Sequence, residues 1–217
     1  MSMPDDLEFE LPNRGDDRPG LDDLDEVVVE DDLDEEDADD VEDDESDDDD
    51  EDDEDYPDDA TEDDIDLVIA LYREDGQAVA LPLELDLAND LEALITQLRR
   101  MPGDGGALGL VSIASEVFVI VRVRGKHVQV LCSDIVAAND WPLARDVVDF
   151  LGVELPEDDD EGLPVGDLDI LADVGLHDFE LEALAEDYEE DSATLVEQIA
   201  TRIKFGPEFT KALASFE

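Results

Sequence analysis

Residues 108–132 read LGLVSIASEVFVIVRVRGKHVQVLC. Apolar and β-branched side chains fill three runs in this stretch, at residues 108–114, 116–124 and 127–132, which is typical of β-strands. The links between the runs are short, and the second link is the tight turn Gly125-Lys126. Because such short links can join only antiparallel neighbours, the stretch predicts a three-stranded antiparallel meander.

A β-hairpin is predicted before this meander. Residues 65–72 are apolar and rich in strand formers, and residues 77–81 follow as a second strand. Asp75-Gly76 lies between them and is a strong turn signal. Pro82 ends the second strand, because proline has no N–H to donate to a neighbouring strand.

The segment between the hairpin and the meander predicts an amphipathic helix. Asn89 can cap its first turn, and Glu92 stands three residues later, where its carboxylate could reach back to the cap. Met101, Pro102 and Gly103 end the helix. Its apolar side chains recur at the spacing of one helix face, which we expect to be buried. These side chains are Leu91, Leu94, Ile95 and Leu98.

After the meander, residues 134–138 predict a helical turn and Asp140 can cap a further helix. Pro142 fits the first turn of that helix, and Gly152 ends it. Its buried stripe is expected to hold Leu143, Val147, Val148 and Leu151. The order ββα-βββ-α therefore predicts an α+β domain over residues 65–153, with helices on one antiparallel five-stranded sheet.

The rest of the chain predicts an acidic linker at residues 154–165 and a helical C-terminal region at residues 166–217. Four short helices are expected there: one closed by Gly175, two capped by Asp178 and Ser192, and one begun by Gly206-Pro207. Short helices cannot bury their apolar faces alone. We expect them to pack on each other and on the sheet.

Charge sets the first 64 residues apart from the rest. The chain has 217 residues and a formal net charge of -58, and 37 of its 70 acidic residues precede residue 65. Strong self-repulsion and few apolar groups predict a disordered acidic tail over residues 1–64. The tail either keeps the protein soluble or attracts a basic partner, and composition does not separate these roles. We expect no direct nucleic-acid or membrane binding by this tail, because phosphates repel it.

The cysteine count and the apolar runs indicate a compartment. Cys132 is the only cysteine, so no disulfide can form within the chain. No secretory signal is visible, and the longest apolar runs are far shorter than a membrane span. A cytoplasmic protein is therefore expected.

Residue types that carry catalysis are scarce. The chain lacks a phosphate-binding glycine loop and a set of zinc ligands, and its best calcium-loop candidate has Leu168 where a bidentate carboxylate is needed. Cys132 could pair with His127 or His177, but it falls in an apolar strand, where a buried thiol is ordinary. We therefore predict a protein that is not an enzyme and has no cofactor or metal site.

One short segment holds the candidate partner contact. Trp141, the only tryptophan, stands between a predicted cap and the start of a helix. A tryptophan there is a core residue or, if exposed, an interaction hot spot. Together with Asp134 and Asn139, it is our candidate for touching a partner.

Three segments resemble one protein family. They are SDIVAANDWPLARDV at residues 133–147, GDLDILADVGL at residues 166–176 and IKFGPEF at residues 203–209. In this order they resemble the tRNA adenosine deaminase-associated proteins of actinobacteria, over roughly residues 65–217 and without the acidic tail. The resemblance implies association with a tRNA adenosine deaminase, the enzyme that makes inosine at the anticodon wobble position. It implies no catalytic residues.

Three hypotheses of function follow. The first is a non-catalytic accessory protein that binds a tRNA adenosine deaminase or another basic protein. The second is a nucleic-acid mimic or charge-based regulator, in which the acidic tail occupies a basic groove of the partner. The third is a small-ligand sensor or an uncharacterised enzyme built on the sheet, which a pocket with converging polar groups would support.

Overall fold

The structure, a computed structural model, describes residues 56–103, 105–155, 157 and 162–216. The predicted disordered tail lies outside the described residues as far as residue 55, and part of the predicted acidic linker also lies outside them. In chain order the elements are β1 (Ile65–Glu74), β2 (Gln77–Pro82), η1 (Leu85–Ala88), α1 (Leu91–Arg99), β3 (Ala107–Ile113), β4 (Val117–Arg124), β5 (His127–Cys132), η2 (Val136–Asn139), α2 (Pro142–Leu151), β6 (Val165–Gly166), η3 (Leu168–Val174), α3 (Asp178–Ala185), α4 (Ser192–Arg202) and α5 (Gly206–Leu213).

The strands form one antiparallel sheet in the order β2-β1-β3-β4-β5-β6. The α+β class and the five predicted strands are confirmed, but the predicted number of strands is wrong, because the described part of the sheet has six. The sixth strand, β6, is two residues long and pairs Val165 with Cys132 and Gly166 with Leu131. A strand of two residues is too short to show an alternation of apolar and polar side chains, so no sequence pattern predicts it. Only its pairing with the edge of β5 makes it a strand.

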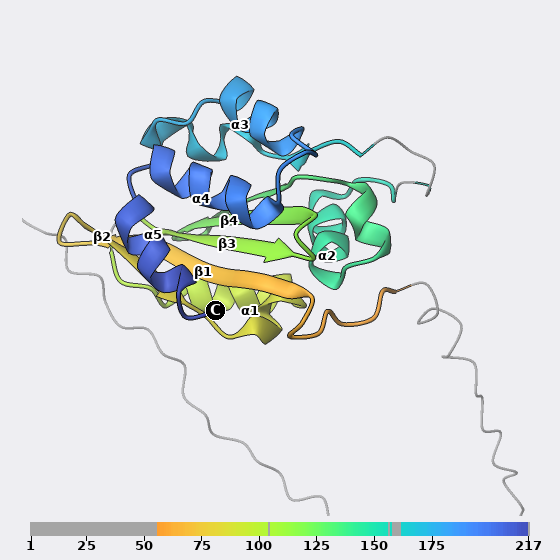
Figure 1. The fold of residues 1–217 in the computed structure, drawn as a ribbon, viewed down its shortest axis with the longest axis horizontal. Coiled ribbons are helices and arrows are strands. Elements are labelled where there is room, and N and C mark those ends of the chain that lie inside the picture. Colours follow the sequence, from red (N-terminus) through yellow and green to blue (C-terminus); the bar gives the residue numbers. More distant parts are fainter. Residues whose placement is uncertain (1–55, 104, 156, 158–161, 217) are drawn as a thin grey trace, which may run out of the picture. The chain divides into compact units, whose positions relative to one another are not determined.

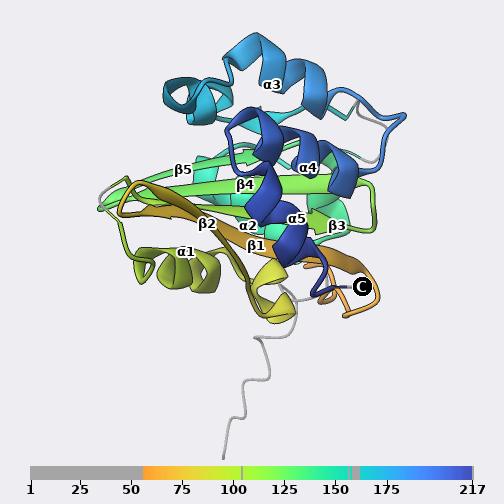
Figure 2. The same ribbon diagram turned by 60° about the vertical axis from the view of Figure 1, so that its left-hand side comes forward.

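Helices cover both faces of the sheet. Figures 1 and 2 show α1 on one face and α3, α4 and α5 on the other. Every residue of β3 is buried, as is every residue of β4 except Arg124. Strands buried on both faces are continuously apolar rather than alternating, which explains the runs in residues 108–124. On the α1 face the core includes Leu94, Leu98, Val111, Val119 and Leu143, and on the other face it includes Leu110, Phe118, Ile120, Val196, Ile199 and Phe209.

The link between β3 and β4 is strained and is held by one carboxylate. Ala114 and Ser115 have φ angles of 54° and 58°, a region that residues other than glycine rarely adopt. Asp66 of β1 accepts hydrogen bonds from the Ser115 backbone N–H (2.7 Å) and from the Ser115 hydroxyl (3.0 Å). The Ser112 hydroxyl donates to the same carboxylate at 2.8 Å. Asp66 thus stabilises the turn that brings the two central strands together.

The first helix has the predicted apolar face but a different cap. Asp90, not Asn89, caps α1, and its side chain accepts from the Ala93 N–H at 2.8 Å. Asn89 instead bonds the backbone of Ala60 in both directions, at 2.8 and 3.0 Å. Asn89 was the wrong choice because a residue 29 positions away competes for its side chain, which no local pattern reveals.

The four predicted C-terminal helices are present as η3, α3, α4 and α5, and they pack on the sheet. Three other predicted caps are displaced by one residue, to Trp141 for α2, His177 for α3 and Asp191 for α4. Ser192 was expected at a cap, but it is buried and its hydroxyl lies 2.6 Å from that of Ser112. Within the described residues, no helix is both long and apolar enough to cross a bilayer.

A buried arginine anchors the second helical layer. Arg122 of β4 donates to the Ile170 carbonyl at 2.5 Å and forms a two-pronged ion pair with Asp173, both in η3. The Arg122 guanidinium, by hydrogen bonding, holds the pKa of Asp173 below its usual range. These contacts fasten η3 to the sheet.

Replacing Arg122 with alanine should lower the free energy of unfolding by about 2 kcal/mol, because the Ile170 carbonyl loses a charged donor. Urea denaturation measures the change. Arg124→Ala is the matched control, since its contact with Asp173 is 3.4 Å long and exposed. The control should cost less than about 0.5 kcal/mol. Equal losses for the two variants would contradict the anchoring role of Arg122.

Candidate functional site

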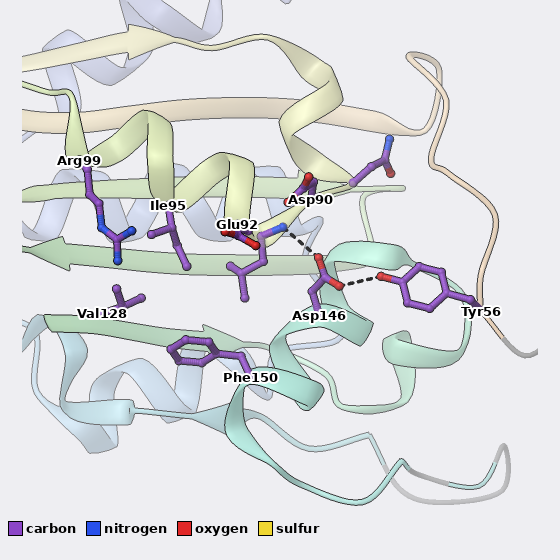
Figure 3. A pocket seen from close by; sticks show the side chains of 10 residues that line it. Tyr56, Asp90, Glu92, Ile95, Arg99, Val128, Asp146 and Phe150 are labelled. Atoms are coloured by element: carbon purple, nitrogen blue, oxygen red, sulfur yellow. Dashed lines mark hydrogen bonds between the residues drawn. The ribbon is translucent and has the colours of Figure 1, made fainter. Parts of the chain in front are cut away.

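A groove of about 650 Å³ opens between α1 and α2, beside the start of β5 (Figure 3). We call it the α1–α2 groove. Its apolar lining comes from three elements: Leu91 and Ile95 of α1, Val128 of β5 and Phe150 of α2. Phe150 reaches from α2 toward Val128 and Ile95, and half of its surface (50%) is exposed. An exposed aromatic side chain in a hollow is typical of binding sites.

The polar end of the groove is organised by Asp146. One oxygen of this carboxylate accepts from the Leu91 N–H at 2.9 Å, and the other accepts from the Tyr56 hydroxyl at 2.6 Å. Leu91 is the first residue of α1, so its N–H has no partner within the helix. A carboxylate at this position also complements the positive end of the helix dipole. Asp146 therefore joins α1, α2 and the segment before β1.

Residues 56–60 lie along this end of the groove, although the sequence places them in the acidic tail. Tyr56 contacts Asp146, the Arg145 guanidinium lies over its ring at 5.7 Å from the centroid, and Ala60 is buried beside Asn89. Burial, and then the hydrogen bond to Asp146, raise the pKa of the Tyr56 phenol. The phenol therefore stays a neutral donor at physiological pH.

Charge differs between the two ends of the groove. Asp90, Glu92 and Asp146 line the end near Tyr56, whereas Arg99 stands at the other end of α1 (Figure 3). A segment that fills the groove would meet carboxylates at one end and a guanidinium at the other. This polarity would orient it.

The candidate partner contact predicted from the sequence lies elsewhere. Trp141 is half-buried at the start of α2 and packs against the core of the α1 face. Asp134 follows β5 and accepts from the Val136 N–H at 2.8 Å, and Asn139 ends η2. The three residues share one short segment, but the groove is lined by other residues. Their role as a partner contact stays a prediction.

Of the groove residues, Phe150 could have been found from the sequence. The predicted buried stripe of its helix is Leu143, Val147, Val148 and Leu151, and Phe150 falls outside it. An aromatic residue off the apolar stripe indicates an exposed ring. Tyr56 and Asp146 gave no such signal, because they are 90 residues apart and only the fold brings them together.

Cys132 and the two histidines stand at different places in the fold. Cys132 is fully buried at the end of β5, where burial raises the pKa of its thiol to about 12, and its Sγ donates to the Asp134 carbonyl at 3.1 Å. His127 begins the same strand at its other end, and His177 caps α3. The α1–α2 groove itself has carboxylates, a phenol and a guanidinium in its lining. This arrangement is suited to binding.

Comparison with known proteins identifies the family. Residues 66–206 match the family model of the Rv3753c-like tRNA adenosine deaminase-associated proteins. The chain belongs to this family. It is also 37% identical over 111 residues to Protein Rv3753c of Mycobacterium tuberculosis, a match that covers 50% of this chain and 64% of that protein. No solved structure matches the chain.

The family region includes the sheet, apart from the first residue of β1, and the helices as far as the first residue of α5. The side chains of the α1–α2 groove from Asn89 to Phe150 lie inside it, and Tyr56 lies before it. The groove is therefore built mainly by the part of the chain that matches the Rv3753c-like family.

Replacing Asp146 with alanine should lower the free energy of unfolding by about 1.5 kcal/mol, because the Leu91 N–H and the Tyr56 hydroxyl both lose their acceptor. Urea denaturation followed by circular dichroism measures the loss. Asp149→Ala is the control on the same helix, since Asp149 is 62% exposed and contacts Arg145 only at 3.8 Å. It should change stability by less than about 0.5 kcal/mol. Similar losses of unfolding free energy for the two variants would contradict the role of Asp146 in joining α1, α2 and the segment before β1.

The Cys132 thiol should resist alkylation by iodoacetamide at pH 8 in the folded protein and react readily in about 6 M guanidinium chloride. The thiolate is the reactive form, and a pKa of about 12 leaves almost none of it at pH 8. Mass spectrometry of the alkylated protein measures the extent of reaction. Rapid labelling of the folded chain would mean that the Cys132 thiol is accessible and reactive, which would contradict its burial and support a chemical role for it.

Proposed function

We propose that this chain is a non-catalytic accessory protein that binds a tRNA adenosine deaminase through the α1–α2 groove. The observation that carries the proposal is the half-exposed ring of Phe150 in an apolar groove with a carboxylate rim, inside the family region. The deaminase is the partner because the family is described as tRNA adenosine deaminase-associated.

Charge complementarity supports this partner. An enzyme that binds tRNA needs a basic surface for the phosphates. Asp90, Glu92 and Asp146 give the groove an acidic end that such a surface can meet. The occupant we propose is a segment of the deaminase whose apolar side chains contact Phe150, with a basic residue near Asp146. The contact is polar at its rim and apolar at its centre, as is usual for protein interfaces.

Two further points belong to the same proposal. We place the protein in the cytoplasm, on the basis of its single cysteine and its predicted partner. Asp134, Asn139 and Trp141 are proposed as a second contact, because they lie on the segment between β5 and α2.

Phe150→Ala should weaken binding to the deaminase about tenfold, because the largest exposed apolar contact of the groove is lost. Isothermal titration calorimetry with the purified full-length chain and the deaminase of the same organism measures the dissociation constant. Phe179→Ala is the matched control, because Phe179 is 65% exposed but lies on α3, on the other side of the sheet.

The control variant should bind within about twofold of the unchanged protein. Both variants should unfold at the same temperature as the unchanged protein, since neither ring is buried. Absence of binding by the unchanged chain would end the proposal. Equal weakening by the two substitutions would place the interface away from the groove.

A further inference from the structure

Strand β2 forms one edge of the sheet and pairs with β1 alone. The Leu83 N–H, just after β2, donates to the Val68 carbonyl of β1 at 2.8 Å. Because the direction of the backbone groups alternates along a strand, the backbone groups of Ala78, Ala80 and Pro82 point away from β1. We call this row of outward groups the β2 edge.

The groups of the β2 edge have no partner in the fold. The N–H and carbonyl groups of Ala78 and Ala80 form no outward hydrogen bond with any residue that the structure describes. Pro82 has a carbonyl but no N–H, so it leaves no unpaired donor at the end of the strand. A row of unpaired donors and acceptors is a template for another strand.

The β2 edge also lacks the charges that usually prevent a second strand from pairing. No residue from 76 to 83 is charged, in a chain in which 38% of the residues are charged. The pairing with β1 continues without a bulge from Gln77 to Pro82. The side chains of Ala78 and Ala80 pack against the core on the α5 face, and Leu81, on the other face, is 40% exposed. An added strand would therefore find an apolar neighbour.

Carboxylates flank this uncharged run, two before it and two after it. All four are exposed, and none forms an ion pair within the part of the chain that the structure describes. The nearest base in the sequence, Arg73, lies over the Phe205 ring at 4.8 Å from its centroid. The four carboxylates are those of Glu74, Asp75, Glu84 and Asp86.

These carboxylates decide which kind of strand can pair with the β2 edge. Two copies of the chain related by a two-fold axis would pair their β2 strands antiparallel, so the start of each strand would lie beside the end of the other. The carboxylates of the two copies would then meet at both ends, and like charges placed in this way repel. A strand with a base at each end would meet opposite charge at both ends.

We propose that the β2 edge binds an extended segment of a partner protein, uncharged in its middle and with a lysine or arginine at each end. Backbone hydrogen bonds to Ala78 and Ala80 supply affinity, and the flanking carboxylates select the basic ends. Asp75 and Glu84 are nine positions apart, which is about 30 Å along a strand and sets the spacing of the two bases.

This surface is separate from the α1–α2 groove. Strands β1, β3 and β4 lie between β2 and β5, and the groove opens beside β5. The proposal therefore holds or fails whether or not the groove binds a deaminase.

Hydrogen exchange of single amides, followed by NMR spectroscopy of the nitrogen-15-labelled full-length chain, tests the proposal. In the chain alone, the N–H groups of Ala78 and Ala80 should exchange at least about tenfold faster than those of Val79 and Leu81, which point toward β1. The probe is a ten-residue peptide of alternating threonine and valine with a lysine at each end.

At about ten times its dissociation constant, the probe should slow exchange at Ala78 and Ala80 about tenfold. The same peptide with a glutamate at each end is the control and should not slow it at that concentration. Exchange is measured at the β2 edge itself, so binding of lysine to carboxylates elsewhere in the chain does not count.

Removing the flanking charges tests the selection of basic ends. Asp75→Asn combined with Glu84→Gln should weaken binding of the lysine-ended peptide about fivefold, the effect of two exposed charge contacts. Asparagine tolerates the φ angle of 51° at position 75, so the turn is kept. Glu182→Gln combined with Glu186→Gln is the matched control, because both carboxylates are exposed on or just after α3. The control should change the dissociation constant less than about twofold.

Ala80→Pro tests the backbone pairing. It should weaken binding of the peptide about tenfold, because the outward N–H is lost and the proline ring obstructs the added strand. A proline is tolerated at an edge position whose N–H faces solvent. Slow exchange at Val79 and Leu81 in this variant would show that β2 still pairs with β1.

Three results would overturn the proposal. Slow exchange at Ala78 and Ala80 in the chain alone, at every concentration, would mean that the chain already covers the β2 edge. Protection that grows with the concentration of the chain would assign the edge to a second copy. Equal protection by the two peptides, or protection by neither, would show that the β2 edge does not select a strand with basic ends.

Discussion

Burial of the central strands on both faces is the constraint on which the rest of this structure depends. β3 is buried along its whole length and β4 along all of it except Arg124, so neither strand has a face that water can cover. Each face therefore needs its own layer of helices. The family match, from residue 66 to residue 206, includes helices of both layers but only the first residue of α5. The helices after β6 are thus part of the same core and cover a face of the same sheet.

The polar groups inside this frame are placed where the layers meet. Arg122 and Ser112 point toward the C-terminal helices, and each finds a partner there, in η3 and α4 respectively. Asp66 holds the strained turn between β3 and β4 at one end of the sheet. Buried polar groups are stabilising only when such partners are present. These contacts therefore fix how the second layer sits on the sheet, while apolar burial supplies most of the free energy.

Charge is distributed as unevenly in space as it is in the sequence. Carboxylates gather around the start of α1, and Arg99 and Arg100 stand at its end. At physiological salt the Debye length is about 8 Å, so groups at the two ends of α1 act largely independently. The α1–α2 groove therefore presents opposite charge at its two ends.

The sequence by itself determined the five long strands, the apolar face of α1 and the family, because each rests on a local pattern or on short segments in a fixed order. It left β6, the caps of four helices and the contacts of Tyr56 undetermined. Asn89 was passed over as a cap in favour of Asp90 because Ala60 competes for its side chain. Tyr56 and Asp146 meet across 90 residues, and the α1–α2 groove exists only because they and Phe150 are brought to one place. Local sequence patterns report which side chains of an element are buried. A hydrogen bond between distant residues depends on how the helices and the sheet pack together, and only the tertiary structure decides this packing.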